Sequence, residues 1–333
     1  MRIAPTISAL AALLFLAAAP AQAQIFRAYL TLDGSDSNPC TLSLPCRLLP
    51  AALTAVADGG EIWMLDSANY NTGPVTIANA VTILAVPGAL GSVVANGGDA
   101  LTITATGPVT LRNLNILPFS GNNNRVGVWK TSAGTLTVQD CNVFGLQVGV
   151  VVQGAGNATV MRSVFRDNVT GIQAVDGATV GVWDTLFANH EGYAGRAVGN
   201  VSTTRLSITR SVSHNTLGVA FSAEAGNAGS VLLDVSEARI EGNDATATGI
   251  YLFTSPGSVG IVNVSNSAIN ALDFGVYAFG NGTTKLFLAG NTITNNVTGV
   301  AQLGTAVAES AGNNAIRNNT VDVSGTLTGV GPF

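Results

Sequence analysis

The sequence predicts an all-β fold, a single right-handed parallel β-helix of about ten coils with a short helix capping its N-terminal end. The main observation is a six-residue phrase of alternating apolar and polar residues that recurs every 22 to 29 positions. Charged residues make up 10% of the chain, against about 25% in ordinary globular domains. The 39 glycines and the many Asn, Ser and Thr residues suit short strands joined by tight turns.

The recurring phrase predicts one coil per repeat. It begins at Leu111, Val138, Val160, Val182, Ile208, Val235, Val264, Leu288 and Ala311. A second phrase, glycine followed by an apolar residue, lies between these, for example at Gly149-Val150 and Gly275-Val276. A coil this short cannot bury its own apolar face, but stacked coils share a continuous core. Because each coil adds one turn of the same hand, we expect parallel pairing with rungs about 4.8 Å apart.

Aligning the phrases predicts columns of equivalent side chains. The first position should form an inward aliphatic stack, and the sixth, which includes Phe165 and Phe187, should form a second one. The fourth position is small and weakly polar, as suits a tight inward corner: Cys141, Ser163, Thr185, Ser211, Ala238 and Ser267. Asparagines, which tolerate left-handed backbone and can bond the next coil, follow the phrase at Asn168, Asn189, Asn215, Asn243, Asn295 and Asn319.

The N-terminus predicts export. Residues 1–23 have a positive start, a short apolar stretch and the small-x-small pattern Ala21-Gln22-Ala23, which together are typical of a secretory signal peptide. No later segment has the ~18 consecutive apolar residues that a membrane span needs. We therefore expect a protein that is secreted, periplasmic or on the cell surface. With a net charge of −5 and two lysines, it offers no basic stripe for nucleic acid, and no cofactor is expected.

The mature chain divides into an N-terminal cap at 24–58 and the β-helix at 59–333. In an exported chain, Cys40 and Cys46 are expected to form a disulfide across their short loop, the alternative being two reduced cysteines. Cys141 is left over, and its place in the repeat predicts a buried free thiol. A helix from Leu49 to Val56 should plug the first coil, and the tail from residue 320 to 333 should cover the other end.

Residues 33–70 resemble the opening of a group of bacterial exported proteins that carry a right-handed parallel β-helix of the pectate-lyase-like superfamily. The resemblance rests on Asp33-Gly-Ser-Asp36-Ser-Asn38-Pro-Cys40, Pro45-Cys46-Arg-Leu-Leu, Ala51-Ala-Leu, Gly59-Gly-Glu-Ile-Trp63 and Tyr70. It implies the same fold for the whole mature chain. Most members of that group have no established activity, and the characterised enzymes of the superfamily act on acidic or neutral polysaccharides.

The motifs of those enzymes are missing from the sequence. The hydrolases carry Asn-Thr-Asp, Asp-Asp, Gly-His-Gly and Arg-Ile-Lys, whereas the calcium-dependent lyases carry Trp-Ile-Asp-His and Arg-x-Pro-x-x-Arg, and none of these strings occurs here. Candidate sites must therefore come from the register of the coils.

The third phrase position alternates in charge over five consecutive coils: Asp140, Arg162, Asp184, Arg210 and Glu237. Side chains one rung apart in a column are close enough to pair. One interpretation is a structural ladder of ion pairs, which we favour because surface pairs are common. The other is a carbohydrate-binding face, in which Asp and Arg would bond sugar hydroxyls.

Two further clusters are candidate sites. The corner after the phrase holds Asp167, His190, His214 and Glu241 on neighbouring coils, which could perform acid–base chemistry or could simply be polar corner residues. Near the N-terminus, the oxygens of Asp33, Asp36 and Asn38 could wrap a calcium ion. A turn is the favoured interpretation there, because calcium needs six to eight ligands.

The leading functional hypothesis is an exported non-catalytic β-helix that acts by surface contact with an extracellular or cell-envelope polysaccharide. A polysaccharide lyase or glycoside hydrolase with an unrecognised site is the first alternative, and a structural or adhesive surface protein is the second. A groove lined by carboxylates and aromatic rings beside one sheet would favour an enzyme or a sugar binder over a structural or adhesive surface protein.

Overall fold

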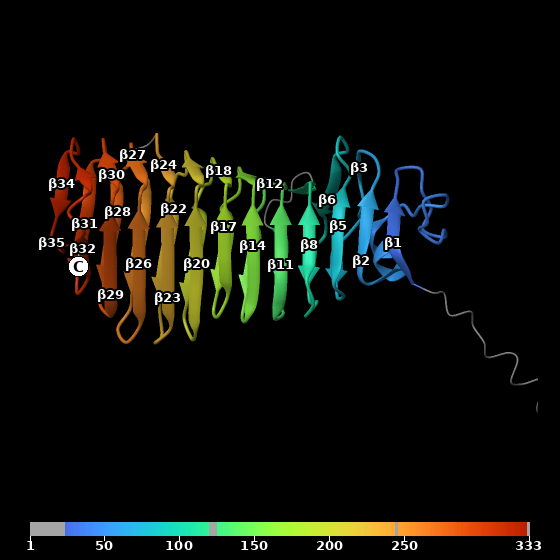
Figure 1. Ribbon diagram of the computed structural model, residues 1–333, viewed down its shortest axis with the longest axis horizontal. Helices are drawn as coiled ribbons and strands as arrows, with labels where there is room; N and C mark the ends of the chain where they lie inside the picture. Colours follow the sequence, from blue (N-terminus) through green and yellow to red (C-terminus); the bar gives the residue numbers. More distant parts are fainter. Residues whose placement is uncertain (1–23, 120–124, 244–245, 332–333) are drawn as a thin grey trace, which may run out of the picture.

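The computed structural model describes residues 24–119, 125–243 and 246–331. The chain winds into a solenoid in which three parallel sheets, named A, B and C, run the length of the molecule (Figure 1). The predicted signal peptide lies outside the described residues. Within the described ranges, no helix is long and apolar enough to cross a bilayer.

Each coil contributes one strand to each sheet in the order A, B, C. Sheet A consists of β1 (Ile25–Leu30), β2 (Val56–Met64), β5 (Val81–Ala85), β8 (Val109–Arg112), β11 (Gly134–Gln139), β14 (Gly156–Met161), β17 (Thr179–Trp183), β20 (Thr203–Thr209), β23 (Ser230–Ser236), β26 (Val259–Ser265), β29 (Thr283–Ala289), β32 (Val307–Ser310) and β35 (Leu327–Gly329). Sheet B consists of β3 (Ala68–Asn69), β6 (Gly91–Ala95), β9 (Leu114–Pro118), β12 (Asn142–Phe144), β15 (Val164–Arg166), β18 (Leu186–Ala188), β21 (Val212–His214), β24 (Arg239–Glu241), β27 (Ala268–Asn270), β30 (Thr292–Thr294) and β33 (Ala315–Ile316). Sheet C consists of β4 (Val75–Ile77), β7 (Leu101–Ile103), β10 (Val126–Lys130), β13 (Val148–Gln153), β16 (Thr170–Val175), β19 (Tyr193–Gly199), β22 (Val219–Ala225), β25 (Thr248–Thr254), β28 (Phe274–Gly280), β31 (Thr298–Gly304) and β34 (Val321–Ser324).

The predicted inward columns are confirmed. Phrase positions one, four and six are buried from coil to coil except in the last phrase, where Ala311 and Ile316 are partly exposed. Phe165 and Phe187 stack inside with ring centroids 5.5 Å apart. The glycine of the second phrase is needed because the next coil passes close by. A Cβ on Gly149 would lie 2.6 Å from the backbone oxygen of Gly171.

Left-handed turns bend the chain from sheet A to sheet B and again from sheet B to sheet C. The first falls on the third phrase position, where Asp140, Arg162 and Asp184 all have positive φ. Left-handed backbone is unfavourable for such residues, and backbone hydrogen bonds to the next coil compensate, for example from Arg162 N to Trp183 O at 3.1 Å.

The asparagines predicted at the second turn occupy two adjacent columns. Asn189, Asn215 and Asn295 have positive φ and form the turn itself, as expected. Asn168 is instead buried one position later, where its amide donates to Val143 O and accepts from Leu146 N of the preceding coil. Asn168 and Asn296 therefore tie their turns to the preceding coil, whereas bonds to the next coil were expected.

The N-terminal end is covered as expected. Helix α2 (Leu49–Ala55) begins next to Pro50 and buries Leu49 and Ala52 against the first coil. Cys40 and Cys46 form the predicted disulfide, and Cys141 is a buried free cysteine. Within the range assigned to the cap, β1 already pairs with β2 in sheet A.

The C-terminal end differs from expectation. The tail from residue 320 does not fold across the solenoid but adds a further turn to it, because β34 pairs with β31 and β35 pairs with β32. Val321 and Val323, which alternate with polar residues, continue the strand pattern and remain exposed.

Candidate functional site

The alternating charge column lies on the exposed edge between sheets A and B. Arg162 Nε is 2.9 Å from Asp140, and Arg210 Nε is 2.9 Å from Asp184. Arg112 of the preceding coil adds a longer contact to Asp140 at 3.8 Å. The hydrogen bond from Arg210 lowers the pKa of Asp184 below its usual value. Asp140 and Asp184 are thus bound by neighbouring arginines, as expected for a structural ladder. Sugar binding by this column remains a prediction.

Glu237 takes the fifth place of the column at the same left-handed turn. Its backbone N–H donates to Ser265 O of the next coil at 3.0 Å. The whole column therefore shares one backbone role, which is to turn the chain from sheet A into sheet B.

The two histidines of the second corner face opposite directions. His190 is buried, with Nδ1 3.1 Å from the backbone oxygen of Asn168, and its desolvation lowers its pKa to about 4. His214 is exposed, and its Nδ1 lies 3.9 Å from Glu241. Glu241 also binds Arg239. One ring thus belongs to the core and the other to the surface, an arrangement that does not favour a shared acid–base site.

Asp167 lies beside the same corner and is engaged from two sides. Arg166 Nη1 approaches its carboxylate at 2.6 Å, and the side-chain amide of Asn189 donates to it at 3.2 Å. Its backbone is in the left-handed turn. These contacts fit the polar corner interpretation, while acid–base chemistry at Asp167 stays a prediction.

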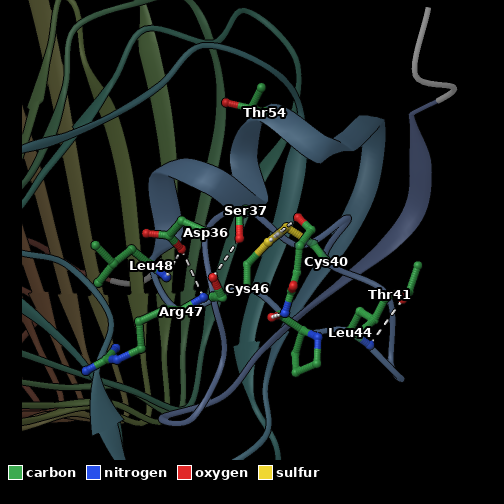
Figure 2. Close-up of a disulfide and its surroundings, with 12 residues drawn as sticks. Asp36, Ser37, Cys40, Thr41, Leu44, Cys46, Arg47, Leu48 and Thr54 are labelled. Atoms are coloured by element: carbon green, nitrogen blue, oxygen red, sulfur yellow. Dashed lines mark hydrogen bonds between the residues drawn. A yellow bond between two sulfur atoms is a disulfide. The ribbon is translucent and has the colours of Figure 1, made fainter. Parts of the chain in front are cut away.

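Asp36, one of the candidate calcium ligands, holds the disulfide loop in place (Figure 2). The carboxylate of Asp36 accepts hydrogen bonds from the backbone N–H groups of Arg47 and Leu48 at 2.9 and 2.8 Å. Asn38 donates its amide to Pro45 O at 2.8 Å, and Asp33 is exposed. Among the described residues, no three His, Cys, Asp or Glu side chains are grouped to hold a metal ion. These hydrogen bonds fit the favoured turn interpretation.

The outer face of sheet C carries a cluster that the sequence analysis did not identify. We call it the aromatic platform. It lies on β19, β22, β25 and β28 and consists of Tyr193, Arg196, Ser222, Glu224, Tyr251, Phe253, Phe274, Tyr277 and Phe279. All except Ser222 are partly exposed, because each alternates with an inward residue of its strand.

The rings of the platform form a contiguous surface. Tyr251 and Tyr277 are in register on neighbouring strands, with centroids 5.5 Å apart, and Phe253 and Phe279 repeat this relation at 5.8 Å. Along one strand, Tyr251 and Phe253 lie 6.4 Å apart and nearly parallel. Phe274 stacks on Tyr277 at 4.9 Å. Such adjacent faces offer a broad apolar contact with polar hydroxyl tips.

An ion pair adjoins the rings. Arg196 donates two hydrogen bonds to Glu224, at 2.9 and 2.5 Å, and its guanidinium lies 4.7 Å from the Tyr193 ring centroid. Buried Ser222 donates to the same carboxylate at 3.0 Å. Desolvation raises the pKa of Tyr251 to about 12, so this phenol stays protonated at neutral pH. A carboxylate bonded to arginine and a protonated phenol at Tyr251 favour binding over proton transfer.

A separate hollow of about 350 Å³ lies on the outer face of sheet A. Trp183 folds over Gly181, where a Cβ would lie 2.2 Å from the indole, and Thr159, Ser207 and Arg205 line the same hollow. A second aromatic surface therefore exists, but it has one ring where the platform has six.

Comparison with known proteins agrees with the coil geometry. The family model described as the right-handed beta helix region matches residues 62–212, and no curated protein matches the chain. Among solved structures, the complex of XylC with xylose is similar at a TM-score of 0.58 and 8% identity, covering 81% of this chain and 69% of that one. The GH136 lacto-N-biosidase of Eubacterium ramulus is similar at a TM-score of 0.57 and 9% identity, covering 92% of this chain and 67% of that one. The A-module of the mannuronan C-5 epimerase AlgE4 from Azotobacter vinelandii has a TM-score of 0.53 and 13% identity, covering 83% of this chain and 91% of that one.

At these identities the similarity to solved structures concerns the fold. The family model, the parallel register of all three sheets and the structural neighbours agree on one conclusion. The chain is a right-handed parallel β-helix.

Proposed function

We propose that this protein is an exported, non-catalytic β-helix that binds an extracellular or cell-envelope polysaccharide through the aromatic platform of sheet C. The observation that carries the proposal is the contiguous set of partly exposed rings on β25 and β28, next to the Arg196–Glu224 pair. Aromatic faces pack against the apolar faces of sugar rings, while hydroxyl and charged groups beside them bond sugar hydroxyls.

Other features support the proposal. The predicted signal peptide and the Cys40–Cys46 disulfide fit an oxidising compartment outside the cytoplasm. The names of the three similar structures refer to xylose, a lacto-N-biosidase and a mannuronan epimerase, all connected with saccharides. The platform's carboxylate is bonded to Arg196 and Ser222, which favours binding over the hydrolase or lyase alternative.

Titration of the mature protein against a panel of polysaccharides tests the proposal. We expect at least one polysaccharide to bind, and Tyr277→Ala to weaken that binding about tenfold, since an aromatic contact contributes on the order of 0.5–1.5 kcal/mol beyond the apolar area that it buries. Phe26→Ala is the matched control, because Phe26 is an exposed ring on β1, far along the solenoid from the platform.

Two results would contradict the proposal. Binding that is lost equally in both variants would place the site elsewhere or reflect general damage. Release of reducing ends or of unsaturated products from a bound polysaccharide would show catalysis and would favour the enzyme alternative.

A further inference from the structure

We infer that the platform takes an uncharged polysaccharide. This inference rests on the proposed function and adds the chemical class of the ligand. The balance of charges on the platform gives this class.

The charges of the platform cancel inside the protein. Of the residues in β19, β22, β25 and β28, Arg196 and Glu224 are the charged ones, and they bond each other through two hydrogen bonds. The guanidinium also rests on the Tyr193 ring, so its face is covered. A bidentate pair of this kind leaves no free cation to receive a carboxylate or sulfate group of a ligand.

The surroundings disfavour an acidic ligand further. Glu191 lies two residues before β19, and Asp273 directly precedes β28, so carboxylates stand at the edge of the platform facing sheet B. The whole chain carries a net charge of −5. An anionic polysaccharide would therefore meet repulsion, whereas an uncharged chain would not.

The test compares neutral and acidic polysaccharides at low and high salt. The neutral probes are glucomannan and xyloglucan, and the acidic probes are polygalacturonate and alginate. We expect the full-length mature protein to bind a neutral probe with a dissociation constant that salt changes by less than about twofold, since no ion pair forms with the ligand. Binding of an acidic probe in preference, weakened by salt, would overturn this inference but leave the proposed function standing. Failure of every polysaccharide to bind would remove the proposed function itself.

The Glu224→Gln variant gives a second measurement. It leaves Arg196 without its carboxylate, so we expect the variant to gain binding of polygalacturonate at low salt by about tenfold. Asp184→Asn is the matched control, because it makes the same change in net charge and frees Arg210 on the edge between sheets A and B. An equal gain in both variants would mean that net charge alone is responsible, which would contradict a role for the platform's ion pair. Circular dichroism of each variant checks that the coil is intact.

Discussion

Arg196 and Glu224 lie on neighbouring coils and are joined diagonally across sheet C, since Arg196 is in register with Ser222 and Glu224 lies two residues further along β22. Both side chains are mostly shielded, with exposed fractions of 30% and 17%. Burial on this scale makes the pair stronger than a fully exposed one, and it also fixes the polar part of the platform.

A double-mutant cycle measures this relationship. Arg196→Ala, Glu224→Ala and the double variant should give a coupling of about 1–3 kcal/mol in the free energy of unfolding, measured by urea denaturation. The exposed pair of Arg210 and Asp184 supplies the comparison and should show a smaller coupling. Equal couplings in the two pairs would mean that shielding by the platform adds nothing.

The core columns predict a large difference between two adjacent residues. Phe187 contacts Phe165 at 5.5 Å and Phe221 at 5.7 Å inside the coil, whereas Leu186 points outward and is 39% exposed. Phe187→Ala should cost about 3–5 kcal/mol of stability because it opens a cavity between stacked rings. Leu186→Ala should cost less than about 0.5 kcal/mol. Similar costs would mean that the strand register is wrong.

The sequence predicted the parts of the fold that repeat. Columns such as Val138, Val160 and Val182 keep one residue type at a fixed position, so their alternation reveals both the strand and its inward face. The disulfide and the helix near Pro50 followed from local signals. The prediction for the tail is wrong, although Val321 and Val323 alternate with polar residues as in a strand. A cap was expected at this end, where one more coil forms.

The platform could not be found in the same way. Its central column runs Gln173, Arg196, Ser222, Tyr251 and Tyr277, so no shared residue type marks it as a column. Coil lengths vary from 22 to 29 residues, so the diagonal contact between Arg196 and Glu224 depends on turn geometry. One signal was available: Tyr251 and Phe253 recur as Tyr277 and Phe279 after the same interval of 26 residues.

The ladder on the edge of sheets A and B makes a prediction about salt. Arg162→Asp would place three like charges on consecutive coils with Asp140 and Asp184, so it should lower the melting temperature at low salt and recover partly at high salt. Arg162→Gln, which removes the charge without reversing it, should lower the melting temperature less. Polysaccharide binding should be unchanged in both variants. A loss of binding without a loss of stability would instead support the carbohydrate-binding interpretation of this column.

The cysteines should differ in reactivity. Burial raises the pKa of Cys141 to about 12, so its thiol stays protonated and enclosed at neutral pH. Mass analysis should find one disulfide, no alkylation of the native protein by iodoacetamide, and alkylation of Cys141 alone after unfolding without reductant. Alkylation of Cys40 or Cys46 in the unreduced protein would contradict the bond between them.

The buried histidine should make stability depend on pH. His190 occupies the same column as the bonded amides Asn168 and Asn296, and its Nε2 has no hydrogen-bond partner among the described residues. Its pKa is about 4 in the folded protein, against an ordinary value of 6.5 in the unfolded chain. Above pH 6.5 the ring is neutral in both the folded and the unfolded chain, so His190 adds no pH dependence to the stability.

As the pH falls from 6.5 to 4, the unfolded chain takes up the proton first, so stability decreases, by on the order of 3 kcal/mol in total. His190→Asn should remove this part of the decrease, because asparagine does not titrate and fits the column. Carboxylates such as Asp184 also lose stabilising contacts in acid, so the quantity to compare is the difference between wild type and variant in urea unfolding at several pH values. His214→Asn, on the exposed side of the same corner, is the control for replacing a histidine at the surface. A His190→Asn variant with the same acid sensitivity as the wild type would mean that the ring is not held neutral by burial.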